Sequence, residues 1–298
     1  MKITELGEFG LIERFRKAIK LDASVIKGTG DDCAVIRFTK DKYLLFTCDM
    51  IVEGVDFRRK ENPYLVGRKA IAVSISDIAA CAGIPRYCLV SMALQKKEKV
   101  EFVDRLFKGM QDICHKYKIN LVGGDLSRCD KLTIDVSMLG EVEKKYLALR
   151  SAARPKDIIF VTGTLGGTIQ GKHLRFTPRL KEARFLAKNF KVHAMTDISD
   201  GLIQDLRHIL KESKTGAIIY QGLIPQSAQA RGLNDALSSG EDFELLFTLS
   251  RYDANRLIRR KLEIFKPVGE ITRKSYGLKI VDEKGREKPV TVDGFRHF

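Results

Sequence analysis

The sequence lacks any long hydrophobic run. No apolar stretch approaches the roughly 18–20 residues that a membrane-spanning helix needs. The opening segment MKITELGEFGLIERF places acidic residues among its apolar ones, whereas a signal peptide would carry a continuous apolar stretch there. We therefore expect a cytoplasmic protein with no membrane partner.

Paired cysteines and the common catalytic signatures are absent as well. The six cysteines form no CxxC pair, which argues against a zinc ribbon or a thioredoxin-type site. The chain has no HExxH pair, no GxSxG elbow and no kinase HRD or DFG sequence. A GxxxxGK match at 166–172 is followed by His173, where a phosphate-binding loop needs a Ser or Thr hydroxyl.

The charge balance is strongly basic, with 53 Lys and Arg against 38 Asp and Glu and a net charge of +15. The basic residues are dispersed, however, and short clusters such as 58–60 and 259–261 contain no interleaved aromatics. We expect no nucleic-acid partner. The charge is better interpreted as a solvated surface, or as attraction for phosphate-bearing small molecules.

The length of 298 residues is enough for about two domains. Apolar residues recur every three or four positions over 100–117, which predicts an amphipathic helix. The small and apolar residues of 63–82 predict a closely packed helix. Strands are predicted at 33–38, 43–48, 120–124 (running into a glycine turn), 133–142, 158–162 and 217–220. Because helices and strands mix without strict βαβ alternation, we expect an α+β fold. The polar segment 144–155 separates two mixed α/β domains, 1–147 and 148–298.

The most informative feature is the placement of the acidic residues. Most follow glycines or strand ends, or precede helices, where loops present functional groups: Asp31, Asp32, Asp49, Asp77, Asp125, Asp197, Asp200, Glu241 and Asp242. Each alone is explained by helix capping or turn formation. Asp77, however, lies in an otherwise apolar helix, where an unpaired carboxylate is costly to bury. Converging carboxylates need cations, and Mg²⁺ typically bridges a few carboxylates to substrate phosphates. The pattern therefore suggests magnesium–nucleotide chemistry.

A set of motifs resembles the thiamine-monophosphate kinase family, within the wider superfamily of aminoimidazole ribonucleotide synthetase and selenophosphate synthetase. In order they are GTGDDCAVI, TCDMIVEGVDF, GRKAIAVSISDIAACAGIPRY, LVGGDLSR, LRSAARPKD with VTGTLGG, DISDGLIQDL, GEDFELLFT and the terminal GFRHF. The resemblance implies two domains of the aminoimidazole ribonucleotide synthetase type. It also implies ATP-dependent phosphorylation of thiamine monophosphate to thiamine diphosphate, with several Mg²⁺ ions and direct in-line transfer. A homodimer with a sheet formed by the N-terminal domains is implied too, and we expect strand 133–142 to complete that sheet.

The same resemblance assigns roles residue by residue. The implied Mg²⁺ ligands are Asp31, Asp32, Thr47, Asp49, Asp77, Asp125, Asp197 and Asp200, of which Asp49, Asp125, Asp197 and Asp200 are the expected catalytic positions. The implied ATP contacts are Asp125, Arg150 and Ser199. The expected substrate contacts are Asp56, Glu241 and Phe295; most relatives carry His at the first of these and Trp at the last. Two alternatives stay open: an ATP-dependent enzyme of the superfamily with another acceptor, and a nucleotide-binding protein without catalysis.

Overall fold

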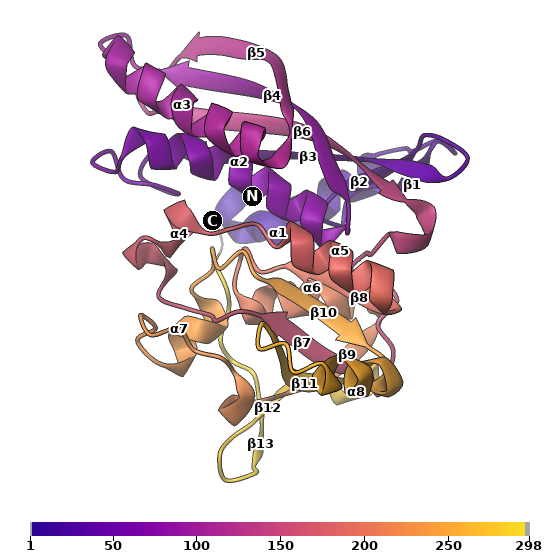
Figure 1. The fold of residues 1–298 in the computed structure, drawn as a ribbon. Coiled ribbons are helices and arrows are strands. Elements are labelled where there is room, and N and C mark those ends of the chain that lie inside the picture. The colour runs from indigo at the N-terminus through magenta and orange to yellow at the C-terminus, as the bar shows by residue number, and fades with distance from the viewer. Residues whose placement is uncertain (1, 296–298) are drawn as a thin grey trace.

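Two mixed β-sheets build the structure, one from each half of the chain (Figure 1). The computed structural model describes residues 2–295. The N-terminal sheet has the order β1 (Val25–Lys27), β2 (Ala34–Arg37), β3 (Lys42–Val52), β6 (Thr133–Glu143), β4 (Ile84–Leu94), β5 (Asn120–Arg128). The C-terminal sheet has the order β13 (Glu287–Pro289), β12 (Leu278–Val281), β9 (Thr215–Tyr220), β11 (Phe265–Arg273), β7 (Ile158–Thr162), β10 (Leu245–Leu249), β8 (Val192–Asp197). Each sheet combines parallel and antiparallel pairs, so the predicted α+β class is confirmed.

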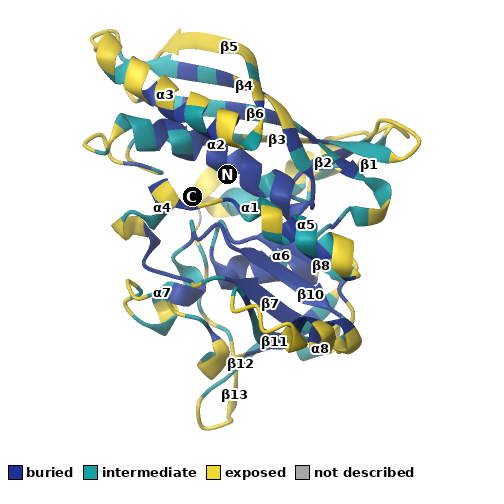
Figure 2. Ribbon diagram, viewed as in Figure 1, coloured by how far each residue is buried: buried dark blue, intermediate teal, exposed yellow. Residues whose placement is uncertain are grey.

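Helix α2 (Pro63–Ala80) joins the two halves. The Asn62 side chain caps it by accepting from the Tyr64 amide, and Pro63 opens its first turn. On one side α2 packs against α3 (Val100–Tyr117), β3 and β6, and on the other against α4 (Lys172–Arg175), α5 (Leu180–Asn189) and β8. Gly67 permits the close crossing with α3, because a Cβ there would lie 1.9 Å from the Leu106 carbonyl oxygen. Figure 2 shows α2 and the central strands of both sheets as the buried interior.

The remaining helices cover the C-terminal half: α6 (Leu202–Ser213), α7 (Leu233–Ser238) and α8 (Arg251–Arg259). Helix α1 (Ile3–Ala18) comes first in the sequence but packs across α6. Arg16 pairs with Glu212 at 2.7 Å, and the Phe9 ring meets the His208 ring edge-on at 5.0 Å. The predicted boundary at 147/148 falls between β6 and β7 and stays a prediction. Within residues 2–295, no helix has the length and apolar character needed to cross a bilayer.

The strand expected to complete a dimer sheet lies in the middle of its own sheet. β6 covers the predicted range, but its two edges are hydrogen-bonded to β3 and β4. It has no free edge to offer a second copy, so this expectation is wrong. Beyond β4, the sheet ends at strand β5.

The glycine pair 123–124 does not form the predicted turn. β5 continues through it to Arg128, so Asp125 lies within a strand. A Cβ on Gly124 would lie 1.7 Å from the Val90 carbonyl oxygen, so this glycine serves the close approach of β5 to β4 rather than a change of direction. Sequence alone does not distinguish the two uses of glycine, because both need the same missing side chain.

Candidate functional site

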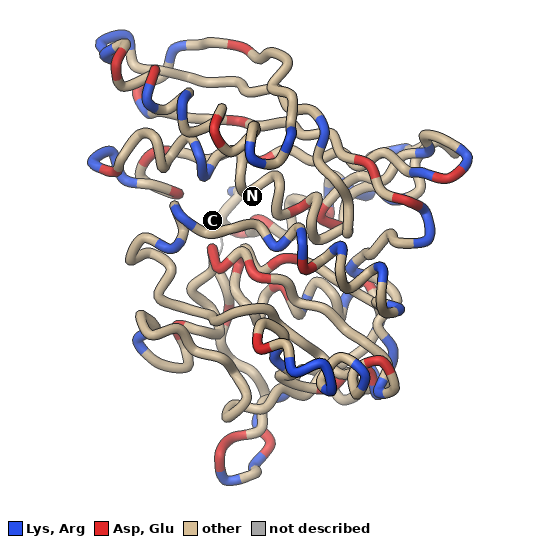
Figure 3. Tube along the Cα trace, in the orientation of Figure 1, with Lys and Arg blue, Asp and Glu red and all other residues tan. Residues whose placement is uncertain are grey.

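Three predicted metal ligands meet where the two halves of the chain join. Asp32 lies in the loop before β2, Asp77 near the end of α2, and Asp197 at the end of β8. One carboxylate oxygen of each lies within 4.8 Å of those of the other two. In Figure 3, acidic segments gather along this junction, whereas Lys and Arg are spread over both halves. The fold therefore gathers residues that are 165 positions apart in the sequence.

Each of these carboxylates is held by a neighbour. The Thr47 hydroxyl donates to Asp77, and the Ser76 hydroxyl donates to Asp197 at 2.5 Å. The Arg150 guanidinium donates to Asp32 at 2.8 Å. These contacts fix the carboxylates in place, but some of the carboxylate oxygens can still accept a further bond.

The cluster has the properties of a cation site. Asp32 Oδ2 and Asp197 Oδ1 are buried without a hydrogen-bond partner. Burial, followed by the charge of Asp32, raises the pKa of Asp197 to about 8. Burial and the neighbouring carboxylates, Asp49 first, raise the pKa of Asp77 well above its ordinary value. An all-oxygen donor set with excess negative charge fits Mg²⁺.

Two further predicted ligands flank the cluster. Asp31 accepts from the Arg150 backbone amide at 3.0 Å, and burial together with Asp32 raises its pKa to about 7. Asp49 on β3 accepts from the Ser74 hydroxyl at 2.7 Å. Burial raises its pKa to about 6 despite that hydrogen bond. Arg150 is thus the one predicted ATP contact that already bonds the acidic cluster.

A cavity of about 290 Å³ opens beside the cluster. It is lined by six of the predicted site residues, namely Asp49, Asp56, Ser199, Asp200, Glu241 and Phe295. Lys69, Thr168, Ser239 and several apolar side chains complete the lining. The Phe295 amide donates to the Asp200 carbonyl at 2.9 Å, so the C-terminal segment is tied to the loop between β8 and α6. A neighbouring cavity of about 390 Å³ shares Asp200 and reaches Asp31, Arg150 and α1. Residues 296–298 of the terminal motif lie outside the described residues.

Asp56 is bonded to the backbone of its own loop. Its carboxylate accepts from the Val52 amide at 2.7 Å and closes the loop that follows β3. Nearby, Arg59 pairs with Glu53 and Glu98.

Asp125 is a predicted ligand that a single chain does not bring to the cluster, and Asp200 groups instead with Asp205 and His208. Asp125 is exposed on β5. In the sheet register it lies in one row with Ser91 on β4, Asp135 on β6 and Met50 on β3. Three strand spacings separate Asp125 from β3, or about 14 Å across the sheet. The exposed side chains Phe46, Met50, Tyr87 and Leu89 also belong to this open face.

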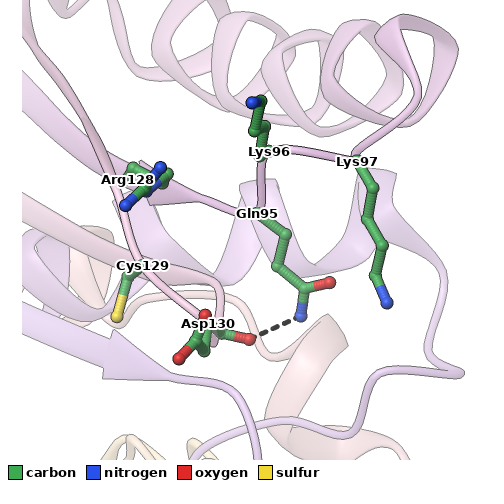
Figure 4. Close-up of a pocket in the computed structure, with 6 residues that line it drawn as sticks. All are labelled: Gln95, Lys96, Lys97, Arg128, Cys129 and Asp130. Carbon is green, nitrogen blue, oxygen red and sulfur yellow. Dashed lines mark hydrogen bonds between the residues drawn. The ribbon is translucent and has the colours of Figure 1, made fainter.

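A larger hollow carries none of the predicted site residues. Figure 4 shows this hollow, of about 670 Å³, lined by Gln95, Lys96, Lys97, Arg128, Cys129 and Asp130. The Gln95 side chain donates to the Asp130 carbonyl at 2.6 Å. Its lysines are exposed in the turn between β4 and α3, so it is part of the basic surface.

Sequence reasoning missed several polar residues that hold the site. On α2 these are Lys69, Ser74 and Ser76, each buried. Thr196 donates to Asp32 at 2.8 Å, and Asp205 accepts from the Asp200 amide at 3.1 Å. The signal that could have found the first group is a lysine and two serines in an otherwise apolar helix.

The GxxxxGK segment is not an anion site. The amides of Gly166 and Gly167 donate to Asp242 and Asp235. Lys172 Nζ lies 3.3 Å from Asp242 and from Glu244. Carboxylates of this chain already occupy the donors that would bind a phosphate.

The fold and the acidic junction define a protein of the AIR synthase class. The family model described as "AIR synthase related protein, N-terminal domain" matches residues 30–142, and its C-terminal counterpart matches 148–280. The thiamine-monophosphate kinase of Buchnera aphidicola subsp. Schizaphis graminum is 35% identical, with 99% of each chain covered. That of Aquifex aeolicus is 36% identical, with 83% of this chain and 87% of the relative covered. The chain belongs to the thiamine-monophosphate kinase family.

A solved structure agrees over the whole chain. "AaThiL complexed with AMPPCP and TMP" superposes with a TM-score of 0.88 at 32% identity, covering 100% of this chain and 99% of that one.

Proposed function

We propose that this chain transfers the γ-phosphoryl group of ATP to thiamine monophosphate, giving thiamine diphosphate and ADP. The observation that carries the proposal is the partly unpartnered carboxylate cluster of Asp32, Asp77 and Asp197, which lies beside a cavity lined by Asp56, Glu241 and Phe295. Family membership and the related structure complexed with AMPPCP and TMP support it. The cytoplasm, where the six free cysteines would stay reduced, is the proposed location.

The acidic cluster would hold magnesium. The three clustered carboxylates are its core, and Asp31, Thr47, Asp49 and Asp200 are the neighbouring oxygen donors of the proposed set. Bound Mg²⁺ would neutralise phosphate charge that the carboxylates alone would repel.

The proposed phosphoryl transfer does not require a strong general base. A phosphate oxygen of thiamine monophosphate is ionised near neutral pH and attacks the γ-phosphorus, while the bond from that phosphorus to the β,γ-bridging oxygen breaks and ADP leaves. No proton must be removed, so positioning and charge compensation supply the rate. Arg150 and Ser199 are the proposed contacts to ATP phosphates, because both lie beside cavities that open onto the acidic residues.

The acceptor cavity suits a cationic aromatic ring. Thiamine carries a fixed positive charge on its thiazolium ring, which Asp56 and Glu241 would attract. Phe295 supplies an aromatic face at the same cavity. A carboxylate at position 56 would repel the substrate phosphate, so the phosphate is expected to point away from it, towards the acidic cluster and its cations.

We propose a homodimer formed through the open face of the N-terminal sheet. Met50, Tyr87 and Leu89 are 59%, 49% and 47% exposed on that face, and exposed apolar patches of this kind mark interfaces. β5 lies at the end of the sheet and is open to a further strand. Because Asp125 shares the face, a second copy would cover it, and we place its role as a metal and ATP ligand at this interface.

An ADP-release assay with and without thiamine monophosphate tests the function. The proposal predicts ADP release that depends on both thiamine monophosphate and Mg²⁺. ADP release without the acceptor would favour another enzyme of the superfamily. Nucleotide binding with no release under any condition would indicate a non-catalytic protein.

A further inference from the structure

Lys69 forms a buried bridge between the two halves of the chain. Its side chain is 0% exposed. Its ammonium group donates to the Asp56 carbonyl at 2.6 Å and to the Glu241 carboxylate. Asp56 belongs to the loop after β3, whereas Glu241 belongs to the turn before β10. One cation therefore ties together two walls of the acceptor cavity.

The turn that carries Glu241 has an unusual backbone. Glu241 and Phe243 have φ values of +54° and +50°, although neither is glycine. The Glu241 amide donates to the Ser199 carbonyl at 2.7 Å, and the Phe243 amide donates to the Ile198 carbonyl at 2.8 Å. Non-glycine residues keep such conformations where the surroundings hold them, often at ligand sites. The backbone of the turn is thus held by these two hydrogen bonds, and the Glu241 side chain is held by Lys69.

The charges around this bridge leave a net negative wall. Glu241 faces Lys69, His173 and Asp56. His173 is buried, with one ring nitrogen 2.9 Å from the Thr168 carbonyl and the other 3.7 Å from Glu61. The ammonium balances Glu241, one of the four carboxylates that line the cavity. The Asp56 carboxylate is left to attract a cationic ligand.

We propose that Lys69 is a positioning residue for the acceptor: it holds Glu241 and the Asp56 loop at a fixed separation, so that both carboxyl groups are in place before a cationic ring binds. The inference rests on the proposed function. In this proposal Lys69 acts neither on ATP nor on the transferred phosphoryl group. The expected effect of removing Lys69 is therefore confined to acceptor binding.

A double-mutant cycle tests this role. Michaelis constants for thiamine monophosphate and ATP are measured for wild type, Lys69→Met, Glu241→Gln and the double variant. Lys69→Met should raise the constant for thiamine monophosphate about 10-fold, with kcat within about threefold and the ATP constant within about twofold. The double variant should lose less affinity than the two single effects combined, because part of the Lys69 effect acts through Glu241. Lys69→Arg, which keeps the charge, should recover part of the loss.

Arg184→Met is the matched control. Arg184 also bridges the two halves, with bonds to Glu143 and to the Ala82 carbonyl at 2.8 Å, but it does not line the acceptor cavity. Its removal should leave both Michaelis constants unchanged, even where thermal stability falls.

The outcomes separate the two proposals. No turnover of thiamine monophosphate by wild type overturns the proposed function, and the role of Lys69 with it. An active wild type with an unchanged acceptor constant in folded Lys69→Met overturns the role of Lys69 alone. Equal effects on both constants, or additive effects in the cycle, would make Lys69 a packing residue. If Lys69→Met does not fold, Lys69→Gln, which retains a donor but no charge, carries the same expectation.

Discussion

Asp197→Asn should stabilise the metal-free protein and reduce the further stabilisation that magnesium provides. In the metal-free protein the carboxylate of Asp197 lies within 4.8 Å of those of Asp32 and Asp77. At that distance, with an effective dielectric constant of about 20, two ionised carboxylates repel by about 3 kcal/mol. Because the pKa of Asp197 is raised in the folded state to about 8, its contribution favours folding at low pH. That contribution is lost as pH rises from about 4 through 8.

At pH 8.5 in EDTA, the amide should therefore stabilise the fold. Some of the relief is offset by the altered bond from Ser76, so we expect a net gain of about 1–3 kcal/mol. For a chain of this size that corresponds to a rise in Tm of roughly 2–5 °C. With Mg²⁺ at about 100 times its Kd, wild type should gain about 2.7 kcal/mol. The variant should gain much less, because it has lost one ligating charge.

Thermal unfolding followed by circular dichroism measures both effects in one series. Asp104→Asn, an equal charge change on the exposed face of α3, is the control and should shift neither curve. A variant that is less stable than wild type in EDTA, or that responds to Mg²⁺ as wild type does, would refute the idea of a shared metal site.

Three further predictions concern the acceptor cavity and the interface. Phe295→Ala should raise the Michaelis constant for thiamine monophosphate roughly 5–30-fold, from a cation–π loss of about 1–2 kcal/mol, while the ATP constant stays fixed; equal changes in both would indicate packing. Asp56→Ala should weaken the binding of thiamine monophosphate measured by calorimetry, while the affinity for ATP stays within about twofold. If neither affinity changes, the Asp56 carboxylate only closes its loop. Light scattering at micromolar concentration should give twice the mass of one chain, and Leu89→Lys should give a monomer; a monomeric wild type would reject the proposed interface.

Much of the fold could be predicted, because its strongest signals are local. The apolar spacing of 100–117 depends on one helix alone, and the structure has α3 at Val100–Tyr117. The role of β6 was mistaken for a different reason. Alternating burial predicts a strand with two unlike faces, but it carries no information about which strands occupy its edges.

The site was predicted as a set of residues rather than as a geometry. The motifs pointed to Asp32, Asp77 and Asp197, and their convergence depends on the packing of α2 against β8. Lys69 escaped notice because its importance arises only from burial against residues 13 and 172 positions away. Asp125 shows the converse. The motifs grouped it with the other predicted metal ligands, but within a single chain it lies apart from them.

Phosphorus NMR of the complete reaction tests the central claim most directly. Wild-type protein with ATP, Mg²⁺ and thiamine monophosphate should convert the acceptor's single phosphorus signal into the paired signals of thiamine diphosphate, with ADP formed in equal amount. Replacing Asp197 by Asn should slow that conversion strongly while the protein stays folded. Appearance of inorganic phosphate with the thiamine monophosphate signal unchanged would contradict direct transfer to this acceptor.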